Sequence, residues 1–167
     1  MGGWESWGTR IGILARLVGI KGAMTGWTNR HPMPPDEEIA RWTLDQPPAL
    51  EALRAGLQRA VRAYAPENAA DLADLAERLM IAATELAGNA LRHGKPPTVV
   101  ALLRADGHLI IDVTDHDPAT RPTADPDRPP GSGGLGLTLT QRLAQEVGWY
   151  PTDTNKHVWA QFNIAED

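Results

Sequence analysis

Three polar residues, Glu85, Asn89 and His93, recur at four-residue intervals within an apolar segment. On a helix, residues at this spacing lie along one face within about two turns of each other. The amide oxygen of Asn89 can bind Mg²⁺, a hard ion that takes few protein ligands and several phosphate oxygens. The Glu85 carboxylate can accept a proton from an attacking hydroxyl. The row therefore fits a magnesium–phosphate site, and an ordinary solvated helix border explains it equally well.

Asp115 ends a run of alternating apolar residues and is soon followed by Pro118. A carboxylate at such a strand end can accept a hydrogen bond from the exocyclic amine of adenine. Guanine has a carbonyl at that position, so the wrong base would leave a polar group unpaired, and the site would select ATP. Taken alone, Asp115 is better explained as the residue that starts a turn.

A glycine-rich run, Gly131 to Gly136, precedes a segment with a helical pattern. Glycines let backbone N–H groups approach phosphates, and a helix N-terminus favours anions. The run lacks the Lys-Ser/Thr of a P-loop and lies too late in the chain for a dinucleotide fingerprint, so a flexible loop explains it equally well. Thr138, which we expect in the first helical turn, can add a hydroxyl to the phosphate contacts.

Other chemistries fit less well. Ser132 lacks the spacing of a nucleophile elbow, and the five His do not pair at metal-ligand spacing. His116, between Asp115 and Asp117, could help to bind a metal, but we favour an exposed loop cluster. The chain has no Cys, which excludes disulfides and suits a reducing cytoplasm. Its net charge of −5 argues against a general nucleic-acid binder.

Hydrophobic periodicity predicts the elements that position these residues. A helix from Ala69 to His93, with Asn68 as N-cap, carries the polar row beside a core stripe and stops at Gly94. Two β-branched runs, 98–104 and 108–114, predict a hairpin. The core stripe consists of Leu72, Leu75, Leu79, Ala82, Leu86 and Ala90. The other expected elements are a strand at 39–44, a helix over 50–61, a helix from 134 to about 147, and strands at 149–150 and 157–164.

This order of elements predicts an α+β fold, a two-layer α/β sandwich with helices on one face of a mostly antiparallel sheet. We expect one domain over residues 38–167 and an N-terminal extension over residues 1–37. The irregular stretch 117–132 is long for a connection and is expected to form a functional loop or lid.

The N-terminal extension is rich in Trp and basic residues, and the apolar residues from Ile11 to Val18 have helical spacing. One interpretation is a segment that docks on a membrane surface or on a partner. The other, which we favour, is a mobile or packed extension, or translation from an upstream start codon. Its longest apolar stretch is too short to cross a bilayer and lacks an export signal, so we expect a cytoplasmic protein.

Taken together, the motifs resemble those of the GHKL ATPases, the superfamily of gyrase, Hsp90, histidine kinases and MutL. The segment from Glu85 to Gly94 is similar to the N box, in the Glu-x-x-x-Asn-Ala-x-x-His form of the bacterial anti-sigma-factor serine/threonine kinases. Asp115 to Pro118 resembles that group's adenine box, Gly134-Leu-Gly136-Leu its second glycine box and Val158 to Phe162 its closing strand. The resemblance covers about residues 38 to 164.

The resemblance implies a histidine-kinase-like (Bergerat) sandwich that binds ATP and Mg²⁺. It implies that Asn89 holds Mg²⁺, that Glu85 is the catalytic base for a Ser or Thr hydroxyl of a partner, and that Asp115 reads adenine. The other nucleotide-binding residues that it implies are His93, Gly133, Gly134, Leu135, Gly136 and Thr138. In such kinases the substrate is an anti-anti-sigma protein of the STAS type, which competes with a sigma factor. The expected role is therefore transcription regulation without direct nucleic-acid contact, and relatives often form homodimers.

Two alternatives stay open. A nucleotide-gated binding module without transfer activity would not need the Glu85 carboxylate. A detached histidine-kinase catalytic domain normally has Asn at that position. Pro118 stands where the wider superfamily has an Asp-x-Gly-x-Gly box, which argues against a gyrase or Hsp90 relative more than against a kinase.

Overall fold

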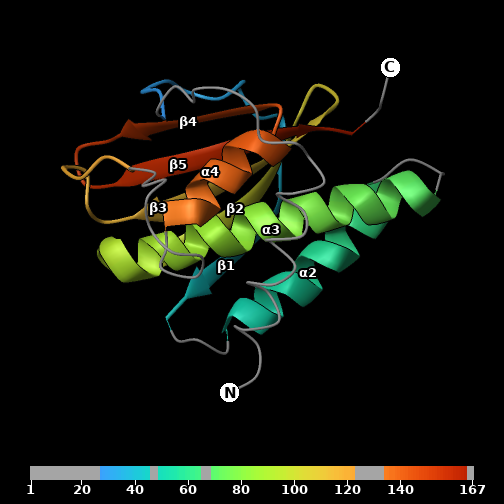
Figure 1. Ribbon diagram of the computed structural model, residues 1–167, viewed down its shortest axis with the longest axis horizontal. Coiled ribbons are helices and arrows are strands. Elements are labelled where there is room, and N and C mark those ends of the chain that lie inside the picture. Colours follow the sequence, from blue (N-terminus) through green and yellow to red (C-terminus); the bar gives the residue numbers. More distant parts are fainter. Residues whose placement is uncertain (1–26, 46–48, 65–68, 123–133, 165–167) are drawn as a thin grey trace.

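The computed structural model describes residues 27–45, 49–64, 69–122 and 134–164 (Figure 1). The elements in chain order are β1 (Glu37–Leu44), α2 (Ala49–Tyr64), α3 (Ala69–His93), β2 (Thr98–Ala105), β3 (His108–Asp115), α4 (Gly134–Leu143), β4 (Glu146–Pro151) and β5 (Lys156–Asn163). Our predictions for the helix at 11–18, the Asn68 cap and most of the loop at 117–132 lie outside the described residues.

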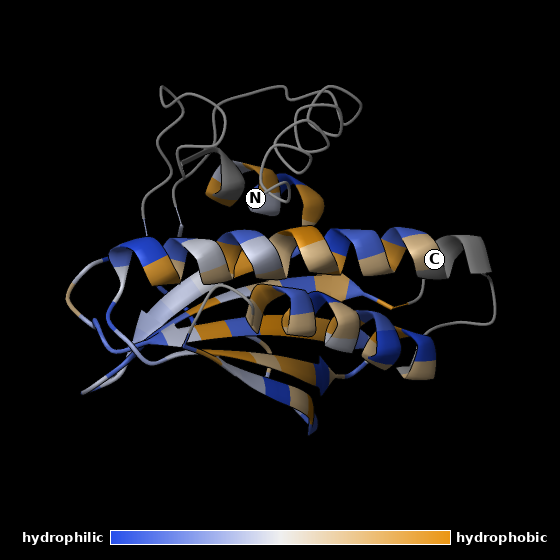
Figure 2. Cartoon of the chain, turned by 90° about the horizontal axis from the view of Figure 1, so that it is seen from below, coloured by the Kyte–Doolittle hydropathy of each residue, from blue (hydrophilic) through white to orange (hydrophobic). Residues whose placement is uncertain are grey.

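The five strands form one sheet in the order β1-β2-β3-β5-β4, and every neighbouring pair is antiparallel. The helices lie on one face of this sheet, and the strands beneath α3 and α4 carry mostly hydrophobic residues (Figure 2). The predicted two-layer α/β sandwich is therefore confirmed. Within the described part of the chain, no helix is both long and apolar enough to cross a membrane.

Helix α3 is the element around which the others pack. It begins and ends where the apolar periodicity and Gly94 predict, and it contacts α2, α4 and strands β2, β3 and β5. The described members of its core stripe are all buried: Leu75, Leu79, Ala82, Leu86 and Ala90. Burial of a side chain such as Leu79 contributes about 1.5–3 kcal/mol, so the stripe fixes α3 firmly on the sheet.

The hairpin between β2 and β3 is confirmed, with Ala105 in the strand rather than in the turn. The turn residues Asp106 and Gly107 both have positive φ, 34° and 77°. Two consecutive positive φ values are typical of the type I′ turn, whose twist matches that of the flanking strands. The turn fixes the register, with Ala105 opposite His108 and Val99 opposite Thr114.

Our prediction for the end of α4 was wrong. The helix ends at Leu143 rather than near Val147, and β4 begins at Glu146. The cause is pairing with a distant strand, since the Gln145 N–H donates to the Gln161 carbonyl at 2.8 Å. Gly148 then lies against Trp159, because a Cβ there would be 2.6 Å from the indole Cζ2.

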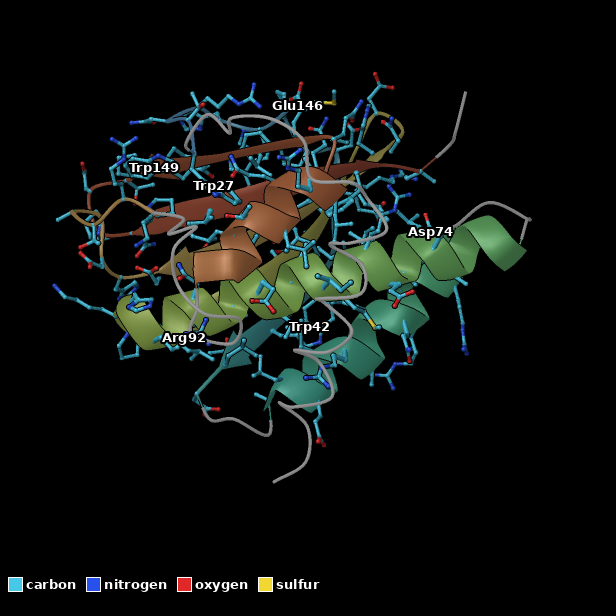
Figure 3. The ribbon with its side chains drawn as sticks, in the orientation of Figure 1. Trp27, Trp42, Asp74, Arg92, Glu146 and Trp149 are labelled. Atoms are coloured by element: carbon cyan, nitrogen blue, oxygen red, sulfur yellow. The ribbon has the colours of Figure 1, made fainter. Side chains whose placement is uncertain are left out.

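Residues 27–36 lie along the outer edge of β4 and then reach the far face of the sheet. Trp27 is only 2% exposed and belongs to the same hydrophobic core as Trp149 (Figure 3). The Arg30 N–H donates to the Trp149 carbonyl, and the Trp149 N–H donates to the Thr28 carbonyl. These bonds cover an edge that would otherwise expose unpaired backbone groups. The division of the chain at residue 37 stays a prediction.

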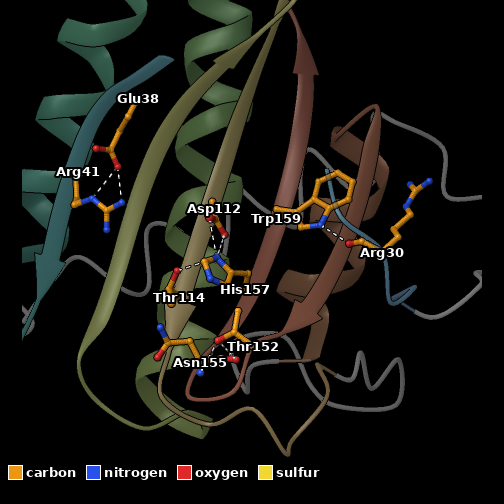
Figure 4. Close-up of polar contacts among 9 residues, drawn as sticks. All are labelled: Arg30, Glu38, Arg41, Asp112, Thr114, Thr152, Asn155, His157 and Trp159. Carbon is orange, nitrogen blue, oxygen red and sulfur yellow. Dashed lines mark hydrogen bonds and ion pairs between the residues drawn. The ribbon is translucent and has the colours of Figure 1, made fainter. Parts of the chain in front are cut away.

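The far face of the sheet carries a smaller cluster of contacts (Figure 4). The Trp159 indole N–H donates to the Arg30 carbonyl at 3.0 Å, and His157 Nδ1 lies 2.9 Å from Asp112 Oδ2. Tyr150 stacks on the His157 ring with centroids 4.5 Å apart. The Trp159–Arg30 bond attaches the segment before β1 to β5, and the other two contacts join β5 to β3 and β4 on this face.

We expect the Trp27→Ala substitution to lower the free energy of unfolding by about 3–5 kcal/mol, because it removes a buried aromatic side chain from the main core. Thr28→Ala, at an exposed neighbouring position, should change it by less than about 0.5 kcal/mol. Urea unfolding followed by circular dichroism measures both. Equal stability of the two variants would show that the buried Trp27 side chain does not stabilise the fold.

Candidate functional site

The polar row on α3 lies along one helix face beside the core stripe. Glu85 and Asn89 are half-buried, whereas His93, in the last turn of the helix, is exposed. Burial raises the pKa of the Glu85 carboxyl group above its ordinary value, and the positive charge of Arg92 partly offsets this effect. Arg92 lies in the C-terminal part of α3 (Figure 3). Glu85 is therefore a carboxyl group whose proton affinity is higher than usual, as a general base requires.

Asp115, the last residue of β3, is 1% exposed. Its Oδ1 accepts the Asp117 N–H at 2.8 Å, a side-chain contact typical of a residue that starts a turn. Its Oδ2 lies 3.4 Å from the ammonium nitrogen of Lys156. The simpler interpretation of Asp115 is thus correct in part, but a turn residue does not need a buried carboxylate with a buried counter-charge. That burial indicates a further role.

The end of α3 and the end of β3 approach each other through Gly94. A Cβ atom on Gly94 would lie 2.6 Å from both Cγ and Oδ2 of Asp115. Just beyond this contact the His116 N–H donates to the Lys95 carbonyl at 2.8 Å. Because Gly94 has no side chain, the carboxylate can lie against the backbone that follows the polar row. The two motifs are therefore brought together in space.

The glycine motif contributes the first residues of α4. Gly134, Leu135 and Gly136 open the helix, and Gly133 lies outside the described residues. Thr138 is half-buried and is the fifth residue of the helix, so it belongs to the second turn rather than the first. The start of α4 lies over the C-terminal half of α3 (Figure 1). Backbone N–H groups at a helix start lack partners within the helix and attract anions.

The donor set of this region fits a magnesium nucleotide. Asn89 offers a half-buried amide oxygen, the type of ligand that Mg²⁺ accepts. Asp115 offers a buried acceptor, and Gly94 leaves no Cβ that would displace it. The start of α4 offers N–H groups for phosphate oxygens.

Two contributors to this region were missed by our sequence analysis. Gly94 was interpreted as a helix stop and as the last residue of the N-box-like segment, but its contact with Asp115 was not predicted, and Lys156 was not considered at all. The one available signal for Lys156 is a charged residue at the start of the apolar strand β5. Its partner Asp115 is 41 positions away in the sequence, so the pairing becomes visible only in the folded chain.

The family of histidine kinase-like ATPase domains matches residues 46–162. The chain belongs to this family. Among solved structures, it is similar to the RsbU and RsbW domains of Rv1364c from Mycobacterium tuberculosis, with 23% identity and a TM-score of 0.52 over 83% of this chain. The chain spans only 34% of that protein chain.

A second similar structure is the Acinetobacter baumannii histidine kinase AdeS. It has 11% identity and a TM-score of 0.49, over 96% of this chain and 77% of the kinase chain. No curated protein matches the chain at a significant level. The family assignment therefore comes from the domain match, and the Rv1364c structure supports the fold.

We expect Gly94→Ala to lower the free energy of unfolding by about 1–3 kcal/mol, because the new methyl group must displace the Asp115 carboxylate or the end of α3. ATP affinity should fall at least about tenfold, which corresponds to 1.4 kcal/mol. Thermal unfolding and titration calorimetry measure the two effects.

Gly88→Ala on the same helix is the matched control. A Cβ there would lie 3.5 Å from Arg92 Nη1, which is an ordinary contact distance. Replacing a helical glycine by alanine stabilises the helix by about 0.5–1 kcal/mol. If the two alanine variants behave alike, the Gly94–Asp115 contact does not matter for the site.

Proposed function

We propose that the chain is an ATP-dependent serine/threonine protein kinase of the anti-sigma type. The observation that carries this proposal is Glu85, a half-buried carboxyl group one helical turn before Asn89 on α3. A domain that only binds nucleotide does not need a carboxyl group with a raised pKa at this position. The N-box motif, the ATPase family and the likeness to a structure with an RsbW domain also support the proposed kinase function.

Each residue of the site has a role in this proposal. Asn89 holds Mg²⁺, and Asp115 accepts a hydrogen bond from the exocyclic amine of adenine. The N–H groups in the first turn of α4 and the Thr138 hydroxyl donate to phosphate oxygens. His93 and residues 133–136 complete the nucleotide-binding set. Bound ATP would supply the phosphoryl group, and the Mg²⁺ held by Asn89 would neutralise its charge. Glu85 accepts the proton of the attacking hydroxyl, so that the partner's oxygen can form the new bond to phosphorus as the bond to ADP breaks.

The partner in this proposal is a STAS-type anti-anti-sigma protein that presents a Ser or Thr hydroxyl, and a sigma factor competes with it. The support is the similarity of the Glu85–His93 motif to that kinase group and the likeness of the fold to the structure of the RsbU and RsbW domains from Mycobacterium tuberculosis. A homodimer, as in many relatives, belongs to the same proposal.

We expect Glu85→Gln to retain ATP binding and to lower phosphoryl transfer at least about 100-fold, because general-base catalysis contributes about 10²–10⁴-fold. Transfer of labelled phosphate to candidate STAS proteins and calorimetry with Mg–ATP measure the two properties. Glu77→Gln, at an exposed position of α3, is the control and should change neither.

Unchanged transfer by Glu85→Gln would remove Glu85 as the base. If the wild-type protein binds Mg–ATP, changes its partner affinity with nucleotide and transfers no phosphate to any candidate, it is the nucleotide-gated module instead. A protein that does not bind Mg–ATP would contradict both functions.

The raised pKa of Glu85 predicts the pH dependence of transfer. The deprotonated carboxylate is the active form, so transfer should rise with pH, with its half-point above the ordinary value of 4.5. Arg92→Met removes the charge that lowers this pKa and should move the half-point to higher pH. Arg62→Met on α2 should leave it in place. A profile that is identical in all three proteins would contradict the assignment.

A further inference from the structure

Lys156, the first residue of β5, has a side chain that is only 6% exposed. Its ammonium group donates to the Thr120 carbonyl at 2.7 Å and lies 3.4 Å from Asp115 Oδ2. Lysine is almost never so buried unless it is paired, because an isolated buried charge is costly. The two contacts connect the acceptor at the end of β3 with the turn that follows it.

The sheet register makes this pairing specific. Asp115 and Lys156 are directly opposite each other on the antiparallel strands β3 and β5. Alternate residues of a strand share a face, and Val113 and Val158 both belong to the core beneath the helices. The carboxylate and the ammonium group are therefore held on the helix side of the sheet, with the carboxylate against Gly94 at the end of α3, rather than in solvent.

A second carboxylate shares the same environment. Asp117 is buried, and its pKa is lowered first by the hydrogen bond from the Thr120 hydroxyl, with the charges of Lys95 and Lys156 contributing. The end of β3 and the turn after it thus contain two buried carboxylates, those of Asp115 and Asp117. Lys156 is a buried cation that contacts Asp115 and the Thr120 carbonyl. Lys95, in contrast, is exposed.

We propose that Lys156 is a specificity-determining residue of the nucleotide site, which holds the Asp115 carboxylate in the orientation that accepts a hydrogen bond from the adenine amine and offers none to guanine. This inference rests on the role of Asp115 under the proposed function. An ionised carboxylate only accepts hydrogen bonds, which suits the adenine amine and leaves the guanine carbonyl without a donor. Lys156 acts through Asp115 and through the Thr120 carbonyl, so it is a positioning residue.

Removal of the ammonium group has a definite chemical consequence. The Asp115 carboxylate would be buried without an opposite charge beside it, and its turn would lose the bond to Thr120. The preference for ATP over GTP should then decrease, because the carboxylate is no longer held toward the adenine amine and the contact that distinguishes the two bases is lost.

The test is a set of four full-length proteins: the wild type, Lys156→Met, Asp115→Asn and the double variant. Calorimetry with Mg–ATP and Mg–GTP gives the ratio of the two affinities for each. We expect Lys156→Met to lower the ATP:GTP ratio at least about tenfold, a change of 1.4 kcal/mol. In the Asp115→Asn background the same lysine substitution should change the ratio less than about twofold, because residues that act through one another are not additive.

Two further variants separate this role from a structural one. Lys156→Gln keeps a donor for the Thr120 carbonyl while it removes the charge, and it should lower the ratio as Lys156→Met does. It provides the same test if Lys156→Met does not fold. Lys95→Met removes an exposed lysine beside the same turn and should leave the ratio unchanged.

If a folded Lys156→Gln or Lys156→Met protein binds ATP normally and keeps the wild-type ATP:GTP affinity ratio, the inference about Lys156 is overturned, while the proposed function is not. An equal loss of preference with and without the Asp115 carboxylate also overturns it, because the lysine would then not act through that residue. Failure of the wild type to bind either nucleotide overturns the proposed function, and the inference with it.

Discussion

The contact between Gly94 and the Asp115 carboxylate is the constraint on which the site depends. It sets the distance between the end of α3 and the end of β3, because no side chain separates them. The polar row of α3 and the buried acceptor of β3 come from distant parts of the sequence. They can serve one ligand only if these two ends stay together. The absence of a Cβ atom at Gly94 is therefore what lets the two ends lie in contact.

The helical periodicity of α3 places both its core-packing residues and its polar row. Its apolar stripe packs on the sheet, and the adjacent row holds Glu85 and Asn89 at the border of the same core. A row on a well-packed helix keeps its side chains in fixed places, which a loop would not. The burial that stabilises α3 is also what raises the pKa of Glu85, so stability and chemistry have one physical source here.

The sequence was sufficient where local pattern decides the structure. The bounds of α3 follow from 3.6-residue periodicity and Gly94, and the β2–β3 hairpin follows from Asp106-Gly107. It was insufficient where distant partners decide. The residues after Leu143 suit a helix, and only their pairing with β5 makes them a strand. For the same reason Lys156 and the second role of Gly94 could not be found, while the nearby row of Glu85 and Asn89 could.

The proposed function gives two carboxyl groups of one fold, Glu85 and Asp115, different roles. Glu85 is half-buried, and the effect of desolvation on its pKa exceeds that of Arg92, so it can take up a proton. Asp115 is more deeply buried, yet its oxygens have the Asp117 N–H and the Lys156 ammonium group beside them, so it is held as an acceptor. The depth of burial alone therefore does not distinguish the two carboxyl groups. The difference comes from the partners, and these are supplied by the turn after β3 and by β5.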